Sequence, residues 1–335
     1  MPITHSRRAV LALACAAALG AASPVFAQAA AAAAKPQTKV SFRLDWKPGG
    51  QHAPFYLGKE RGFYAVEGID LTIISGSGSS DSIKQLGAGA VDLALVDALV
   101  LVQGAEQKVP VKAVAAYYQR TPIVLISPKT KPLTDPQQLT RGAKIGSKRA
   151  SATSQGLTAL LAVNKIDPKS VNLVDIGFGV QPLLVGQVDA LMGFTMNEAI
   201  EAESVGMPVN ELLIANYGVN AYGLTIATSD KFLKDHPELV RAFIRATRKA
   251  VEASVADSNT ANQAVAKSVS EVDVARENKV LAKTAPFWSV QGKPLTSFGS
   301  QTAAGWQQTI ETAKRVGLVE EAPKLADVLA EGFAQ

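Results

Sequence analysis

The stretch KVSFRLDWKPGGQHAPFYLGKE, Lys39 to Glu60, decides the fold. Apolar residues alternate with polar ones from Val40 to Trp46, which predicts a strand with one half-buried face. A turn with a proline and two glycines follows. Pro54 then stands where a helix would begin, because the N–H that proline lacks is unpaired there anyway. The stretch therefore predicts one strand–turn–helix unit.

The same plan recurs along the chain. DLTIISGSGSSDSIKQLGAG, residues 70–89, reads as a strand, a Gly/Ser turn and a helix with Ser80 or Asp81 as its N-cap. Past residue 128 the pattern restarts, and Gly186–Ala190 repeats the form of Gly89–Leu93, 97 positions later. Strands alternating with helices indicate a parallel sheet. We expect an α/β chain with two similar lobes, each a mostly parallel sheet flanked by helices.

Two extended apolar stretches are the natural places for the chain to cross between lobes. They are TPIVLIS, residues 121–127, and YGLTIAT, residues 222–228, and turns bound both. We therefore expect one lobe to contain residues 38–124 and 227–335, and the other to contain residues 125–226.

The first 27 residues have the layout of a secretory signal peptide. Arg7–Arg8 precede an apolar stretch, residues 9–22, and Val25–Ala27 form a small-residue cleavage site. The apolar stretch is shorter than the roughly 20 residues of a membrane-spanning helix, so we expect export to the periplasm and not a membrane anchor. The arginine pair also resembles a twin-arginine signal. Residues 28–37 read as a flexible leader.

Removal of the signal peptide narrows the function classes. The net charge falls from +5 to +3, with 32 Lys and Arg against 29 Asp and Glu, and no basic run is interleaved with aromatics. We therefore expect no nucleic-acid binding. The only cysteine, Cys15, leaves too, and His52 and His236 remain far apart. A Ser-His-Asp triad would have to use one of these histidines. We expect no metal, no cofactor and no catalytic residue.

Polar residues collect where the predicted strands end, and open parallel sheets bind ligands there. Trp46 ends its strand beside a flexible turn, so its ring could stack on a flat ligand, and His52 could bond a heteroatom. The alternatives are a core tryptophan and a capping histidine. In a cleft between lobes the expected ligand contacts are Asp45, Trp46, His52, Ser77, Asp97, Gln119, Arg149, Ser151, Thr153, Ser154, Thr195, Asn197 and Glu198.

Two polar turns suggest different ligands. SGSGSSD, residues 75–81, resembles a phosphate cradle, but Asp81 replaces the third glycine of that motif and would repel an anion. SKRASATSQG, residues 147–156, places Lys148 and Arg149 at a helix N-terminus, where backbone N–H groups favour an anion. Arg149 could grip a carboxylate or sulfonate with two hydrogen bonds. A solvated basic turn with a Ser/Thr cap is the alternative.

With Trp46, Pro48 and His52 in the pattern W-x-P-x-x-x-H, the opening stretch resembles the thiamine-pyrimidine-precursor family. That family comprises periplasmic binding proteins for pyrimidine precursors and the fungal pyrimidine synthases. The wider group includes alkylsulfonate and taurine binding proteins of ABC importers. AGAVDLALVDA, KIGS, GQVDALMGF and SDKFLKDHPELVRAFIRATRKAV follow in the family's order, so the resemblance runs from about residue 40 to 260.

The resemblance implies a two-lobed periplasmic binding protein that closes on a small molecule and delivers it to a membrane permease with an ATPase. It also implies that Trp46 and His52 line the pocket, and we expect a monomer. A synthase-like enzyme is the alternative, but the mature chain lacks the synthases' cysteine cluster. Thr195 stands where pyrimidine binders often have an acid, with Glu198 one turn away. We therefore favour an aromatic or heterocyclic acid or a sulfonate over a pyrimidine precursor.

Overall fold

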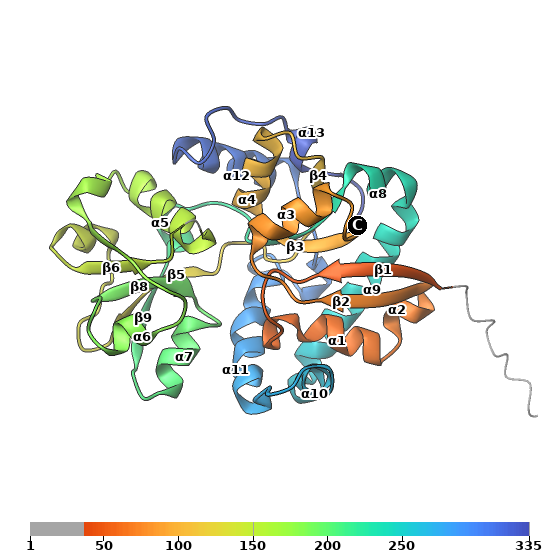
Figure 1. Cartoon of the computed structure of the whole chain (residues 1–335), viewed down its shortest axis with the longest axis horizontal. Helices are drawn as coiled ribbons and strands as arrows, with labels where there is room; N and C mark the ends of the chain where they lie inside the picture. Colours follow the sequence, from red (N-terminus) through yellow and green to blue (C-terminus); the bar gives the residue numbers. More distant parts are fainter. Residues whose placement is uncertain (1–36, 150, 335) are drawn as a thin grey trace, which may run out of the picture. The chain divides into compact units, whose positions relative to one another are not determined.

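The structure is a computed structural model that describes residues 37–149 and 151–334. The predicted signal peptide, and the predicted leader up to residue 36, lie outside these ranges. Within them the chain forms two five-stranded sheets flanked by helices, which Figure 1 shows coloured by sequence. None of the helices in this described part is both long and apolar enough to cross a lipid bilayer.

The first sheet takes four strands from the start of the chain and one from beyond its middle. They are β1 Thr38–Arg43, β2 Ile69–Ile74, β3 Leu93–Asp97, β4 Val111–Ala116 and β10 Leu224–Ser229. Their spatial order is β2-β1-β3-β10-β4. β1 pairs in parallel with β2 and β3, whereas β10 runs antiparallel to β3 and β4. Four strands thus share one direction, which confirms the mostly parallel sheet.

The second sheet repeats this arrangement with the intervening strands. They are β5 Ile123–Pro128, β6 Lys144–Ser147, β7 Asn172–Asp175, β8 Ala190–Phe194 and β9 Val209–Leu213. Their order is β7-β6-β8-β5-β9, with β6 parallel to both its neighbours and β5 antiparallel to β8 and β9. Each sheet therefore holds one reversed strand in the fourth position.

Two segments carry the chain between the sheets. One joins β4 to β5 and the other joins β9 to β10, so each reversed strand directly follows a crossing. We call the first sheet with its helices the first lobe, and the second sheet with its helices the second lobe. The predicted division of the chain after residues 124 and 226 stays a prediction at the level of single residues.

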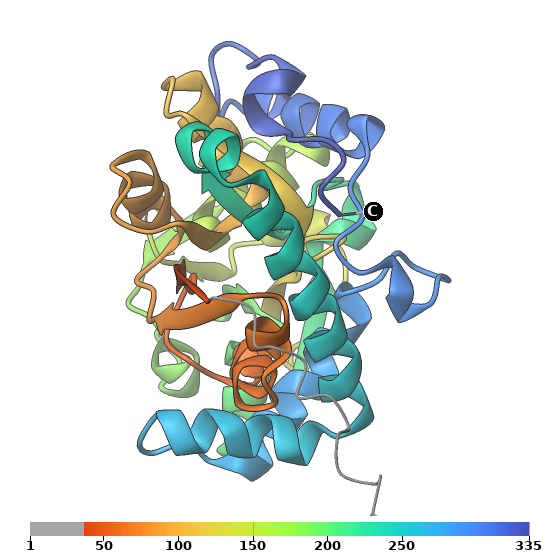
Figure 2. The same ribbon diagram turned by 90° about the vertical axis from the view of Figure 1, so that its right-hand side faces the viewer.

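Helices cover both faces of the first sheet because its central strands are apolar on both sides. Leu95 faces a core with α1, α9, α10 and α11, whereas Val96 faces a second core with α3, α4, α12 and α13. Figure 2 shows the long helix α9 running across this lobe. The helices of the first lobe are α1 Ala53–Glu60, α2 Phe63–Val66, α3 Ser79–Gly87, α4 Ala98–Glu106, α8 Asp230–Asp235, α9 Pro237–Ala256, α10 Ser258–Ser268, α11 Val274–Thr284, α12 Ala303–Arg315 and α13 Leu325–Val328.

The second lobe is smaller and is also a three-layer structure. Its helices are α5 Ala152–Val163, α6 Gln181–Leu184 and α7 Glu198–Ser204. Leu125 of β5 packs with α5 on one face of the sheet, and Ile126 packs with α6 and α7 on the other.

Helix starts follow the local sequence with one exception. Pro54 and Pro237 lie in the first turns of α1 and α9, as predicted. The predicted cap of α3 at Ser80 or Asp81 is wrong, because the N-cap is Gly78 with φ of 120°. Glycine adopts that conformation without a steric penalty, and Asp81 is left free to make other bonds.

The repeated Gly-x-Val-Asp sequence has the same structural role in both lobes. The Asp92 carboxylate, just before β3, accepts hydrogen bonds from the backbone N–H of Ser41 (2.8 Å) and from its hydroxyl (2.7 Å). The Asp189 carboxylate, just before β8, accepts the backbone N–H of Lys144 at 2.9 Å. Each aspartate thus ties its own strand to the neighbouring parallel strand, β1 or β6.

Substitution of Asp92 tests this role. Asp92→Ala leaves a donor of β1 without its charged acceptor, so we expect the free energy of unfolding to fall by about 1–3 kcal/mol. Chemical denaturation measures the loss, with Asp70→Ala on the exposed side of β2 as the control. Equal stability of the two variants would show that the Asp92 bonds contribute nothing to the sheet.

Candidate functional site

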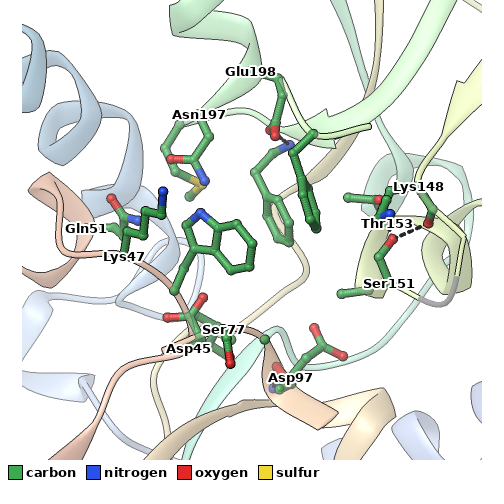
Figure 3. Close-up of a pocket in the computed structure, with 18 of the residues that line it drawn as sticks. Asp45, Lys47, Gln51, Ser77, Asp97, Lys148, Ser151, Thr153, Asn197 and Glu198 are labelled. Carbon is green, nitrogen blue, oxygen red and sulfur yellow. Dashed lines mark hydrogen bonds between the residues drawn. The ribbon is translucent and has the colours of Figure 1, made fainter. Parts of the chain in front are cut away.

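A cavity of about 710 Å³ lies between the two lobes. The first lobe forms one wall with the turns after β1 and β2, the end of β3 and the start of α11. The second lobe forms the other wall with the segments that follow β6, β7 and β8 (Figure 3). These are the carboxyl ends of parallel strands, where open sheets bind ligands. Of the predicted contacts, the cavity is lined by Asp45, Trp46, Ser77, Asp97, Ser151, Thr153, Asn197 and Glu198.

The turn after β1 holds Trp46 at the cavity wall by close backbone packing. A Cβ atom on Gly50 would lie 2.2 Å from the carbonyl oxygen of Glu277 in α11, and the Gly50 N–H donates to the Glu277 carboxylate. A Cβ atom on Gly76 would lie 2.0 Å from the carbonyl oxygen of Leu44. Only glycine permits these approaches, and Trp46 is left half-buried beside the cavity.

His52 does not line the cavity, and its predicted contact with the ligand stays a prediction. Its side chain is fully buried, and its Nε2 lies 2.8 Å from the Asp45 carboxylate. Asp45 is partly exposed and does line the cavity. The histidine therefore acts one step behind the wall, where it orients a carboxylate that faces the ligand space.

Asp97 ends β3 and caps α4. Its carboxylate accepts the backbone N–H of Leu99 at 3.0 Å, and its own N–H donates to the Ser79 hydroxyl at 3.0 Å. Burial raises the pKa of Asp97 to about 7, although the backbone donors of α4 act in the opposite direction. The cavity thus contains a carboxyl group that titrates near neutral pH.

The Gly/Ser turn after β2 carries a negatively charged side chain that is bonded within the turn. Ser77 donates to the Asp81 carboxylate at 2.9 Å, and Arg43 forms an ion pair with the same carboxylate. The Ser77 hydrogen bond is the main cause that lowers the pKa of Asp81. A fixed negative charge therefore occupies the place where a phosphate would sit.

The basic turn after β6 presents Lys148 to the cavity, and not Arg149. The Arg149 side chain is 83% exposed and lies 3.6 Å from Asp175, and its predicted contact with the ligand stays a prediction. Ser151 and Thr153 line the cavity, but Ser154 bonds back to Ser151 as part of the N-terminal cap of α5. Because the cap satisfies these groups, the turn is less open to an anion than its sequence suggests.

Beyond β8, Asn197 and Glu198 line the cavity (Figure 3). The Glu198 carboxylate accepts the backbone N–H of Phe194 at 2.8 Å, and burial raises its pKa. Asn197 precedes α7 without capping it by a side-chain bond. The amide of Asn197 is therefore not engaged in the cap.

Thr195 and Gln119 do not line the cavity, and their predicted contacts with the ligand also stay predictions. Thr195 donates to the Glu211 carboxylate, which also lies 2.5 Å from the Lys283 ammonium of α11. This ion pair joins the two lobes. Gln119 donates to the carbonyl oxygen of Ser300 at 2.9 Å and so serves the first lobe internally.

Several wall residues are not among the predicted ligand contacts. Phe178 follows β7 and so satisfies the strand-end rule, but nothing in its sequence distinguished it from a surface residue. Lys47 and Gln51 flank the predicted turn contacts. Arg276 and Glu277 come from α11, more than two hundred residues after the turn they pack against, and no local pattern identifies them.

The chain is similar to several curated proteins. It is 27% identical over 290 residues to the riboflavin-binding protein RibY of Chloroflexus aurantiacus, with 84% of this chain and 82% of that protein covered. It is 24% identical over 275 residues to the formylaminopyrimidine-binding protein of Halalkalibacterium halodurans, with 81% and 83% covered. It is 26% identical over 231 residues to the Saccharomyces cerevisiae 4-amino-5-hydroxymethyl-2-methylpyrimidine phosphate synthase THI12, with 65% and 68% covered.

Solved structures with the same fold have lower identity. The periplasmic aliphatic sulphonate binding protein SsuA of Escherichia coli superposes with a TM-score of 0.71 at 12% identity, over 90% of this chain and 99% of that chain. A Candida albicans gene product described as having the generic periplasmic binding protein fold gives 0.64 at 15% identity, over 90% and 98%. The chain thus has the two-lobed α/β periplasmic binding protein fold.

The family follows from a match to most of the chain. Residues 50–261 fit the family model described as NMT1/THI5 like. The match begins in the turn after β1, includes the whole second lobe and ends in α10. The predicted resemblance is therefore confirmed: the chain belongs to the NMT1/THI5-like family.

Proposed function

We propose that this protein is the solute-binding component of an ABC importer, which captures a small, flat organic nutrient between its lobes and delivers it to a membrane permease with an ATPase. The observation that carries the proposal is Trp46, whose side chain lies on the wall of a cavity large enough for such a molecule. An aromatic ring at a cavity wall provides an apolar face for stacking.

The relatives support binding in preference to catalysis. Two of them are named as binding proteins and align with more than four-fifths of this chain, whereas the yeast synthase aligns with 65% of it. Asp97 and Glu198, two acidic residues of the wall, accept hydrogen bonds from backbone N–H groups. Enzymatic activity of the synthase type is the alternative.

The polar groups of the cavity favour a heterocycle over an anionic ligand. Asp45, Asp97 and Glu198 offer carboxyl groups to N–H donors and to ring nitrogens, while Arg149 points away from the cavity. In the turn after β6, Lys148 is the cation that lines the cavity. We therefore replace the predicted carboxylate or sulfonate contact at Arg149 with recognition of a neutral, heteroatom-rich ring.

The proposal includes export. Residues 1–27 would direct the chain to the periplasm, through the twin-arginine route if the arginine pair is read as that signal. The mature protein would act as a monomer whose lobes divide near residues 124 and 227. Closure of these lobes on the solute would create the form that the permease recognises.

Native mass spectrometry of the purified protein tests the function directly. We expect a small aromatic or heterocyclic molecule to copurify unaltered, and calorimetric titration of the stripped protein to return stoichiometric binding. Riboflavin, an aminopyrimidine and an aromatic acid serve as titrants. Conversion of the bound molecule into a product would instead support the synthase alternative.

Trp46 should dominate the affinity. Aromatic stacking is worth about 0.5–1.5 kcal/mol beyond the area buried, so Trp46→Ala should weaken binding by roughly tenfold when the lost contact area is included. The midpoint of thermal unfolding of the unliganded protein should hardly change, because Trp46 is half-buried. Trp46→Phe is the matched control. A loss of several kcal/mol of stability in Trp46→Ala would identify Trp46 as a core residue.

The Asp97 carboxyl should make stability depend on pH near neutrality. Between the ordinary pKa of about 4 and the raised value of about 7, the folded protein binds a proton that the unfolded chain does not. The wild type should therefore lose about 1–3 kcal/mol relative to Asp97→Asn between pH 5 and pH 8. Asparagine still caps α4, so the variant should fold. Denaturation at each pH measures the difference, and a constant difference would contradict the raised pKa.

A further inference from the structure

Phe178 is one of two aromatic side chains, with Phe194, that the second lobe contributes to the cavity wall. It stands between Gly177 and Gly179, three residues beyond the end of β7, and its side chain is 60% exposed. Other large aromatic side chains, such as Phe55 and Phe243, are fully buried in the core. The Phe178 ring is therefore not part of the buried core.

The ring of Phe178 meets Trp46 across the cavity. The two ring centroids lie 4.8 Å apart with an angle of 55° between the planes. The ammonium group of Lys148 lies over the Phe178 ring, 5.4 Å from its centroid. Trp46 comes from the first lobe, and Phe178 and Lys148 come from the second, so this contact depends on how the lobes approach each other.

A flat ligand does not fit between the two rings at this separation. Carbon atoms in contact lie about 3.5 Å apart, so a ring stacked on both sides needs its neighbours about 7 Å apart. One of the two rings must therefore withdraw by about 2 Å to admit a ligand between them.

The backbone on each side indicates which ring moves. The turn that carries Trp46 is held by close packing at Gly76 and by the Gly76 N–H, which donates to the Trp46 carbonyl oxygen at 3.0 Å. Phe178 has a glycine on either side. A Cβ atom added to Gly177 would have no other atom within 4 Å, and Gly179 has φ of 88°. The Phe178 ring can therefore shift without disturbing a packed element.

We propose that Phe178 is a specificity-determining residue that stacks on the second face of the ligand ring while Trp46 stacks on the first. The ligand class is thereby narrowed to aromatic molecules with two accessible faces, and an alkyl chain would gain little from the site. This inference rests on the proposed function, because it concerns the same cavity.

Affinity measurements on Phe178 variants test the inference. Riboflavin and an aminopyrimidine are the flat probes, and butanesulfonate is the non-aromatic probe. We expect Phe178→Ala and Phe178→Leu to weaken binding of a flat probe by about two- to tenfold, since leucine restores apolar volume but no aromatic face. Phe178→Tyr should bind like the wild type. Leu173→Ala, which removes another exposed apolar side chain of the same lobe, should change nothing.

The outcomes separate this inference from the function on which it rests. Wild-type affinity of Phe178→Leu for the flat probes, alongside weak binding by Trp46→Ala, would overturn the inference and leave the function standing. Tight binding of butanesulfonate that neither Phe178→Leu nor Trp46→Ala weakens would overturn both this inference and the proposed capture of a flat nutrient. A readout without ligand completes the test: loss of the ring contact in Phe178→Leu should change the tryptophan fluorescence of the empty protein, because the other two tryptophans, Trp288 and Trp306, are fully buried.

Discussion

The reversed strand inserted into each sheet is the constraint on which the rest of the structure depends. β5 and β10 are hydrogen-bonded on both edges, and each enters its sheet directly after the chain has crossed from the other lobe. Each sheet is therefore completed by a strand that the chain forms directly after it leaves the other lobe. The same crossings direct the carboxyl ends of the parallel strands of both lobes towards one cavity, and residues far apart in sequence become neighbours on its walls.

The protein itself holds three carboxyl groups of that cavity in place. His52 orients Asp45, the start of α4 binds Asp97, and the Phe194 N–H binds Glu198. Such groups lose little conformational freedom when a ligand arrives, which favours affinity. The same bonds limit the choice of ligand, because a group that already satisfies a helix terminus has fewer directions left in which to bind a solute.

The sequence predicts the fold better than the site. Strand–turn–helix units, the restart after residue 128 and the placement of Trp46 all depend on local patterns, and the structure has them. Arg149 shows why side-chain contacts are harder to predict than strands and helices. Lys148 and Arg149 are adjacent and both basic, and only the path of the backbone decides which one faces the cavity. His52 is a second example, because its ring is buried and bonds to the Asp45 carboxylate, and the local sequence does not predict that contact. The contribution of α11 to the cavity wall depends on long-range packing, which no local sequence pattern predicts.

The carboxylates of Asp92 and Asp189 have the same structural place in the two lobes. Both precede the third parallel strand of their sheet, and both bind the backbone of the first. In both lobes, the contact that joins the parallel strands and the turns that face the cavity therefore lie at opposite ends of one strand, β3 or β8.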